Sequence, residues 1–134
     1  MNLENIKTIA IIGLSDKPDR PSYQVAQYLI KESYKIIPVN PNIKEVFGQK
    51  SYPDIASISS EIKIDIIDVF RKSEDVPGVV QEIIKSGRKS VIWLQEGINN
   101  PKAVNLAKSH GFEISSGICL MKYHQSLDKN VNLF

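Results

Sequence analysis

One loop of this sequence combines residue types that bind anions. The segment GLSDKPDRPS, residues 13–22, holds one glycine, two serines, Lys17 and Arg20, and it lies between an apolar run and a helical pattern. At the N-terminus of a helix, unpaired backbone N–H groups and the helix dipole favour an anion, most often a phosphate. A dinucleotide fingerprint has three glycines in such a loop, and any surface turn uses these same residue types. On this loop alone, a phosphate site and a plain turn are equally consistent with the sequence.

The segment PVNPN, residues 38–42, contains no carboxylate. Enzymes that bind NAD usually place an acidic residue at the end of the second strand, where it holds the ribose hydroxyl groups. Val39, Asn40 and Pro41 stand at that point here. The sequence therefore favours a ligand with a phosphorylated or differently seated ribose over NAD, although NPN is also typical of a simple turn.

Two more segments carry candidate ligand contacts at strand ends. In VFRKSE, residues 69–74, Arg71 could pair with a phosphate through two hydrogen bonds, and Phe70 could pack on an apolar ligand arm. The alternative for Arg71 is a solvated side chain at a strand end. In LQEGINN, residues 94–100, Gln95 and Gly97 follow another apolar run. The glycine there either lets the backbone approach a ligand closely or forms a plain turn.

The residues able to act as acids, bases or nucleophiles do not form a catalytic set. His110 is expected in the last turn of a helix, where it would complement the dipole, and His124 lacks a partner at motif spacing. A free cysteine such as Cys119 is more often a small core residue than a nucleophile. Asp65 and Asp68 lie three apart in one apolar run, so they point to opposite faces of a strand. We expect no catalytic residue and no metal site.

The elements that position these loops alternate between strand and helix. Continuous apolar runs suit strands buried on both faces of a parallel sheet; they are TIAIIG (8–13), YKIIPVN (34–40), IDIIDVF (64–70), SVIWLQ (90–95) and FEISS (112–116). Amphipathic patterns predict helices that start at Pro21 or Ser22, run from after Ser73 to Gly87, and run from Asn100 to Gly111.

A sixth strand would complete a known strand order. GQKSY (48–52) could form an edge strand and PDIASIS (53–59) a short helix. The chain then matches a Rossmann-like, doubly wound α/β fold in three layers with strand order 3-2-1-4-5-6. Ligands bind such sheets at the carboxyl ends of the strands, where the order reverses, so the loops above would surround one crevice.

Composition limits the functional classes. The chain has 134 residues, enough for one domain, and its 17 basic and 15 acidic residues leave a net charge of +2, too small for a nucleic-acid-binding face. There is no apolar run of membrane-spanning length and no apolar signal core in MNLENIK, so we expect a cytoplasmic protein without membrane partners. We expect one domain over residues 1–124 and a tail without periodicity over residues 125–134, which permits a monomer or a homodimer.

Taken together, the quoted segments resemble one family over residues 6–121. With GICL (117–120), they are similar in order and spacing to small CoA-binding proteins related to the N-terminal CoA-binding domain of the succinyl-CoA synthetase α subunit. The resemblance implies a Rossmann-like fold that seats coenzyme A. The positions that it assigns to the phosphates, the adenosine part and the pantetheine arm are Gly13, Leu14, Ser15, Lys17, Arg20, Ser22, Val39, Asn40, Pro41, Phe70, Arg71, Gln95 and Gly97.

Three hypotheses follow for the function. The first is a protein that binds CoA or an acyl-CoA without catalysis of its own, because the synthetase's second domain has no counterpart in these segments. The second is a small NADP-dependent oxidoreductase or another nucleotide-using enzyme, which the missing GxGxxG motif disfavours. The third is a regulatory protein in which the crevice no longer binds a ligand.

Overall fold

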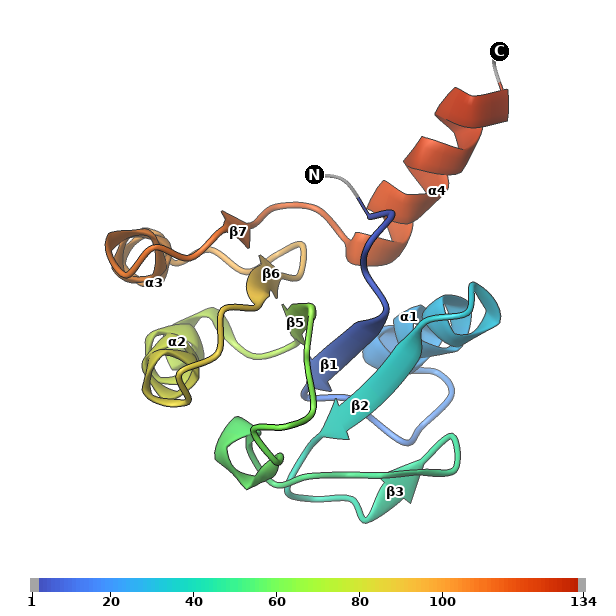
Figure 1. Ribbon diagram of the computed structural model, residues 1–134. Helices are drawn as coiled ribbons and strands as arrows, with labels where there is room; N and C mark the ends of the chain where they lie inside the picture. The colour runs from blue at the N-terminus through green and yellow to red at the C-terminus, as the bar shows by residue number, and fades with distance from the viewer. Residues whose placement is uncertain (1–2, 133–134) are drawn as a thin grey trace.

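The computed structural model describes the backbone of residues 3–132 and the side chains of residues 3–127. A parallel sheet forms the centre of the fold (Figure 1). Its strands stand in the order β2-β1-β5-β6-β7. Their bounds are Lys35–Val39 for β2, Thr8–Ile12 for β1, Ile66–Val69 for β5, Val91–Leu94 for β6 and Ile114–Ser115 for β7. The chain winds outward in both directions from β1 and β5, so the reversal lies between these two strands, as predicted.

The expected sixth strand does not join this sheet, and the full order 3-2-1-4-5-6 is not confirmed. Instead β3 (Glu45–Val46) and β4 (Gln49–Lys50) form an antiparallel hairpin. Phe47 and Gly48 both have positive φ, at 55° and 71°, which is the geometry of a tight two-residue hairpin turn. Only Tyr52 reaches the main sheet, through a single parallel bridge to Val39. The next acceptor of such a ladder, the Asn40 carbonyl, accepts from the Ser51 Oγ atom at 2.9 Å.

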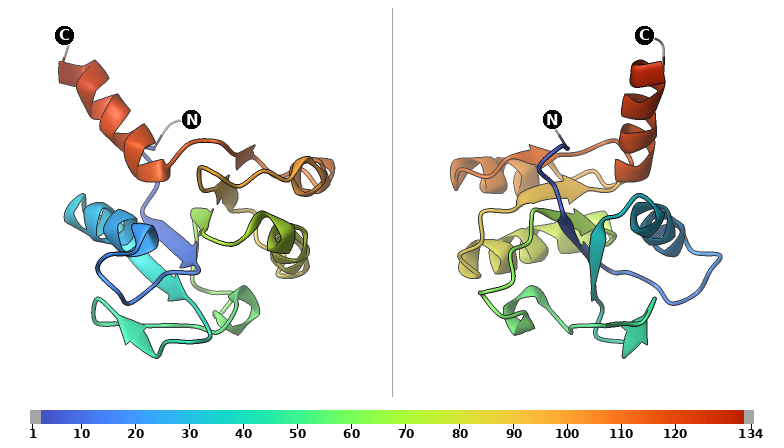
Figure 2. Two further views of the ribbon diagram at one scale, coloured as in Figure 1. Left: turned by 180° about the vertical axis from the view of Figure 1, so that it is seen from behind. Right: turned by 45° about the vertical axis from the view of Figure 1, so that its right-hand side comes forward.

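Helices cover both faces of the sheet, which gives the three layers expected (Figures 1 and 2). On one face α1 (Pro21–Lys31) and the start of α4 (Leu120–Asn132) pack over Ile9, Ile11 and Trp93. On the other face lie α2 (Val76–Lys85), α3 (Pro101–Ser109) and the short 3-10 turn η1 (Ile55–Ser57). A second such turn, η2 (Ser73–Asp75), leads into α2.

The predicted helices begin and end for recognisable reasons. Proline occupies the first turn of α1, α2 and α3, where its missing N–H group removes no intrahelical hydrogen bond. The Asn100 side chain caps α3 by accepting a hydrogen bond from the Ala103 N–H at 3.0 Å. These features confirm the helical segments predicted after residues 20, 73 and 100.

The C-terminal segment differs from the tail without periodicity that the sequence suggested. Residues Leu120–Asn132 form α4, which passes through the expected boundary at residue 124. Its first turns are anchored by buried Leu120, by Tyr123 packed 5.3 Å from the Trp93 ring, and by a 2.6 Å hydrogen bond between His124 Nδ1 and the Tyr28 hydroxyl. The rest of the helix extends away from the sheet (Figures 1 and 2). Residues 133–134 lie outside the described part of the chain.

Candidate functional site

The loop after β1 crosses the end of β5 at very short range. Gly13 has a φ of +86°, and a Cβ atom at this position would lie 2.1 Å from the Phe70 carbonyl oxygen. The Gly13 N–H group donates to the Val39 carbonyl at 2.8 Å. Gly13 is therefore required because three strand ends meet here, which is a structural reason separate from any contact with a phosphate.

Both serines of this loop are used within the loop. The Ser15 N–H group donates to the Ser22 Oγ atom at 2.9 Å, and the Lys17 N–H group donates to the Ser15 Oγ atom at 3.1 Å. Ser22 is buried, as is Leu14, whose side chain belongs to the core beneath α1. Ser15 and Ser22 were predicted to contact a phosphate, and in the structure they make hydrogen bonds that shape the loop.

The two cations of the loop are exposed beside a cavity. This loop cavity has a volume of about 370 Å³ and is lined by Gly13, Ser15, Lys17, Arg20, Pro21, Ser22 and Phe70. Within residues 3–127, the charged ends of Lys17 and Arg20 make no hydrogen bond or ion pair. Arg20 is also the N-cap residue of α1, and no side chain caps this helix. Two unengaged cations and an uncapped helix start thus face one hollow, an arrangement that favours an anion.

A second cavity of about 290 Å³ adjoins the first at Gly13. This strand-end cavity is lined by Ile12, Gly13, Val39, Asn40, Pro41, Asn42, Pro53, Asp54, Arg71, Val79 and Glu82. The structure therefore places Arg71 beside the end of β2. Arg71 lies apart from the loop cavity and makes a 3.4 Å ion pair with Asp75 on the surface.

Two carboxylates in this cavity were not found from the sequence. Asp54 and Glu82 reach it from η1 and α2, whereas the sequence argument considered only the residues directly after β2. Each has one oxygen engaged, because Asp54 Oδ1 accepts from the Ser57 N–H and Glu82 Oε1 accepts from the Ile55 N–H, both at 2.8 Å. The lack of a carboxylate in PVNPN therefore does not mean that the cavity lacks one.

Gln95 and Gly97 follow β6 at the same edge but line neither of these cavities. Gln95 is buried, and its Oε1 atom has no hydrogen-bond partner among the described residues. Gly97 is exposed, with a φ of +91°. Beside it, Glu96 holds Lys122 of α4 at 2.8 Å, and this contact raises the pKa of the Lys122 ammonium.

The two aspartates of the β5 run have different surroundings. Asp65, at the amino end, accepts hydrogen bonds from the Lys7 and Thr8 N–H groups, both at 3.0 Å. Asp68 is fully buried, and neither of its oxygens has a partner among the described residues. Burial raises the pKa of Asp68 from its ordinary value of 3.8 to about 8.

The remaining reactive side chains stay apart. Cys119 is buried in the core, and His110 is the C-cap residue of α3. Among the described residues there is no group of three or more His, Cys, Asp or Glu side chains placed to hold a metal ion. In that part of the chain, none of the helices combines the length and the apolar character needed to cross a membrane.

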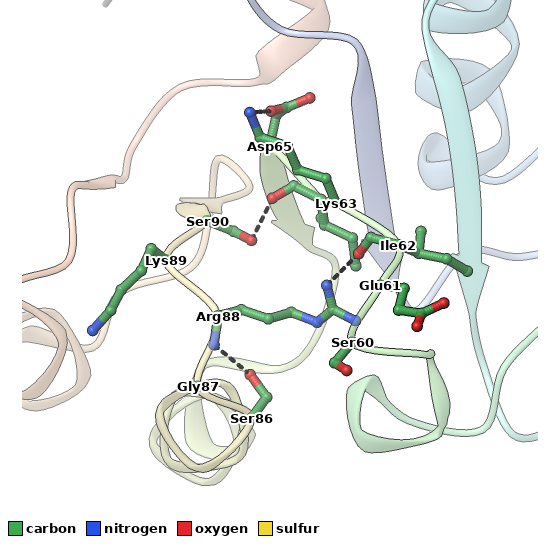
Figure 3. A pocket seen from close by; sticks show the side chains of 11 residues that line it. Ser60, Glu61, Ile62, Lys63, Asp65, Ser86, Gly87, Arg88, Lys89 and Ser90 are labelled. Atoms are coloured by element: carbon green, nitrogen blue, oxygen red, sulfur yellow. Dashed lines mark hydrogen bonds and ion pairs between the residues drawn. The ribbon is translucent and has the colours of Figure 1, made fainter.

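A third cavity, of about 360 Å³, lies at the opposite edge of the sheet (Figure 3). In this amino-edge cavity the Arg88 guanidinium points across to the chain before β5 and donates to the carbonyls of Ile62 at 2.6 Å, Ser59 at 2.8 Å and Ile58 at 3.2 Å. Ser90 Oγ likewise donates to the Ile64 carbonyl at 2.6 Å. Arg88 and Ser90 thus have partners and join two loops of the fold. Of the two lysines that also line this cavity, Lys63 pairs with Asp65 at 3.6 Å, and the exposed Lys89 side chain makes no hydrogen bond or ion pair within residues 3–127.

Comparison with known proteins identifies the family of this chain. Residues 7–125 match the family described as "CoA binding domain". The chain belongs to this family. The uncharacterised protein YneT of Bacillus subtilis is 38% identical over 122 residues, which cover 91% of this chain and 88% of YneT.

Two further proteins similar to this chain differ in size. A solved structure from Thermus thermophilus has 31% identity and a TM-score of 0.87, and the match covers 93% of this chain and 92% of that one. An ADP-forming acetate–CoA ligase of Archaeoglobus fulgidus is 30% identical over 81% of this chain, but the match covers only 17% of the ligase. Members of the CoA-binding domain family thus include proteins of this size and parts of larger enzymes.

Proposed function

We propose that this chain binds coenzyme A or an acyl-CoA in the loop cavity and the strand-end cavity, without catalysis of its own. The observation that carries the proposal is the pair of unengaged cations, Lys17 and Arg20, at a cavity that adjoins a second one at Gly13. Coenzyme A consists of an adenosine 3′-phosphate joined by a pyrophosphate to a pantetheine arm. An anionic centre flanked by a nucleoside matches two adjoining cavities of this kind.

The fit assigns each cavity a part of the ligand. The pyrophosphate would lie in the loop cavity, where Lys17 and Arg20 donate and Phe70 packs against the start of the pantetheine arm. The adenosine part would lie in the strand-end cavity, where Arg71 faces the ribose phosphate and the second oxygens of Asp54 and Glu82 accept from hydroxyl or amine groups. The Arg71 to Asp75 ion pair is exposed, so releasing Arg71 for a phosphate costs little.

Isothermal titration calorimetry with CoA, dephospho-CoA, NADP and NAD tests the proposal. We expect CoA to bind most tightly and dephospho-CoA to bind more weakly, because dephospho-CoA lacks the phosphate that Arg71 would meet. No detectable CoA binding, or tighter binding of NADP than of CoA, would contradict the proposal. Incubation with acetyl-CoA checks the second part, since release of free thiol above the uncatalysed rate would indicate an enzyme.

A double variant tests the two cations directly. Lys17→Ala with Arg20→Ala removes two charge-assisted contacts, so the affinity for CoA should fall at least about tenfold. The thermal midpoint should stay unchanged because both side chains are exposed. Lys31→Ala with Lys35→Ala, at the far end of α1 and the start of β2, is the matched control with the same change in net charge. Equal losses of affinity in both double variants would indicate only a general charge effect.

A further inference from the structure

The Asn40 side chain links the end of β2 to the loop after β1. The residue is half-buried directly after β2. Its Nδ2 atom donates to the Leu14 carbonyl in the loop after β1 at 2.9 Å, and its Oδ1 atom accepts from the Asn42 N–H at 2.9 Å. The amide group thus has partners on both sides, which differs from a side chain held ready for a ligand.

The hydrogen bond to Leu14 stands where the backbone ladder between β1 and β2 stops. The last backbone contact of this ladder runs from the Gly13 N–H to the Val39 carbonyl at 2.8 Å. In a parallel pair the next contact would come from the N–H of residue 41. That residue is Pro41, which has no N–H to donate. The Asn40 side chain supplies a donor in its place and extends the contact into the loop.

Asn40 is itself held from the other side of β2. Ser51 Oγ donates to the Asn40 carbonyl at 2.9 Å, and the Asn40 N–H donates to the Tyr52 carbonyl at 2.8 Å. Ser51 is buried and lines neither the loop cavity nor the strand-end cavity. The backbone from which the Asn40 side chain projects is therefore held by Ser51 and Tyr52, which line neither cavity.

We infer that Asn40 is a positioning residue, which fastens the anion-binding loop to the end of β2 and holds Lys17 and Arg20 in place for the ligand phosphates. This inference rests on the proposed binding of CoA. It changes the role of Asn40 from a contact of the adenosine part to a support of the phosphate part. A direct contact would matter only for ligands that contain adenosine, whereas a support matters for every ligand whose phosphate binds to the loop.

Two fragments of CoA distinguish a direct contact with adenosine from a support of the loop. 4′-Phosphopantetheine has the phosphate and the arm but no adenosine, and adenosine 3′,5′-bisphosphate has the nucleoside and two phosphates. For Asn40→Ala we expect the dissociation constant of phosphopantetheine to rise about tenfold, as for the loss of one well-oriented hydrogen bond. Ser51→Ala, which removes only the support of Asn40, should act in the same direction by about threefold. Asn105→Ala, an exposed asparagine on α3, is the matched control and should change neither constant.

Affinities are measured at a temperature where all variants are fully folded, so a general loss of stability leaves the dissociation constants unchanged. An unchanged phosphopantetheine constant, with a loss confined to the adenosine bisphosphate, would overturn the inference. Amide hydrogen exchange of residues 14–20 in the ligand-free protein is the second measurement, and it should be faster in Asn40→Ala. If the wild-type protein binds neither CoA nor these two fragments, the proposed function fails. Unchanged amide hydrogen exchange of residues 14–20 in Asn40→Ala would separately refute the support by Asn40.

Discussion

The two edges of the sheet carry cavities of similar size, 360 Å³ at the amino edge and 370 Å³ at the loop after β1, but the hydrogen bonding around them differs. At the amino edge, Arg88 donates to three carbonyls and Asp65 accepts from two backbone N–H groups. At the carboxyl edge, the described contacts leave the charged ends of Lys17 and Arg20 unengaged. Volume does not distinguish the two edges. The arginines that line the two cavities differ, because Arg88 donates to three carbonyls whereas the Arg20 side chain makes no hydrogen bond or ion pair within residues 3–127.

Buried polar atoms follow the same division. Within the described residues, the buried side-chain atoms without partners are both oxygens of Asp68 and Oε1 of Gln95, which lie in the carboxyl-terminal half of β5 and just after β6. Unpartnered polar groups destabilise a fold, and they gather at functional sites because the site's chemistry requires them. At the amino edge Arg88 and Asp65 have partners within the protein, whereas these three buried oxygens nearer the carboxyl edge have none among the described residues.

The largest expected effect is a pH dependence of the stability that comes from Asp68. Its pKa in the folded protein is raised to about 8, so between about pH 4 and pH 8 the folded state keeps a proton that the unfolded chain releases. The free energy of unfolding therefore falls as pH rises through this range. The Asp68→Asn variant has no ionisable group at this position, so its stability relative to wild type should rise by about 4 kcal/mol between about pH 4 and pH 7. Urea unfolding at several pH values measures the difference.

Asp65→Asn is the contrasting change on the same strand. Asp65 accepts from the Lys7 and Thr8 N–H groups through one oxygen, Oδ2. Its Oδ1 atom pairs with Lys63 at 3.6 Å. An asparagine oxygen can still accept both hydrogen bonds, but the change removes the negative charge that strengthens them and the ion pair. This variant should be less stable than wild type at neutral pH, as urea unfolding measures. An Asp65→Asn variant as stable as wild type would show that the contacts of Asp65 do not stabilise the amino edge.

The sequence predicts the sheet well because the signals for its elements are local. The five strands are identified by continuous apolar runs, and the three helices by prolines at their starts and by Gly87 and Gly111 at the ends of two of them. The reversal between β1 and β5 was predicted from the strand order of a doubly wound fold, because local signals carry no strand order. Leu120, Tyr123 and Leu127 are spaced as i, i+3 and i+7, which is the spacing of an amphipathic helix, so the sequence contained a signal for α4 that the prediction of a tail without periodicity missed. The hairpin β3–β4 depends on a left-handed Phe47, which no residue preference predicts.

The site is predicted less completely than the sheet, because residue types do not reveal their partners. Serine suits both a phosphate contact and an internal loop contact, and only the structure shows that Ser15 and Ser22 bond within the loop. Asp54 and Glu82 come from elements that the motif argument did not examine. Whether Lys17, Arg20 and Arg71 bind a ligand stays a prediction.

Replacing two glycines tests whether the carboxyl edge is also the more tightly packed one. In Gly13→Ala the new Cβ would meet the Phe70 carbonyl at 2.1 Å, in addition to the strain of a positive φ, so the loss of stability should be about 3 kcal/mol or more. Gly87→Ala in the turn at the amino edge has a similar φ of +75° but no atom within 4 Å, so only about 1 kcal/mol should be lost. Chemical denaturation compares the pair, and equal losses would mean that backbone strain alone, and not close packing, requires Gly13.

The smallest expected effect concerns Arg88. Arg88→Met keeps most of the apolar stem of the side chain but removes the donor to the carbonyls of Ile58, Ser59 and Ile62. The carbonyls nearest the surface can accept a hydrogen bond from water instead. The loss of stability should be about 2 kcal/mol, whereas Lys89→Met at the exposed neighbouring position should change stability by less than about 0.5 kcal/mol. Because Arg88 lies at the edge opposite to the proposed site, the affinity of the folded variant for CoA should remain within about twofold of wild type by calorimetry. A stability loss accompanied by a clear loss of affinity would break the comparison, since it would mean that the loop network at the amino edge also sets the geometry of the carboxyl edge.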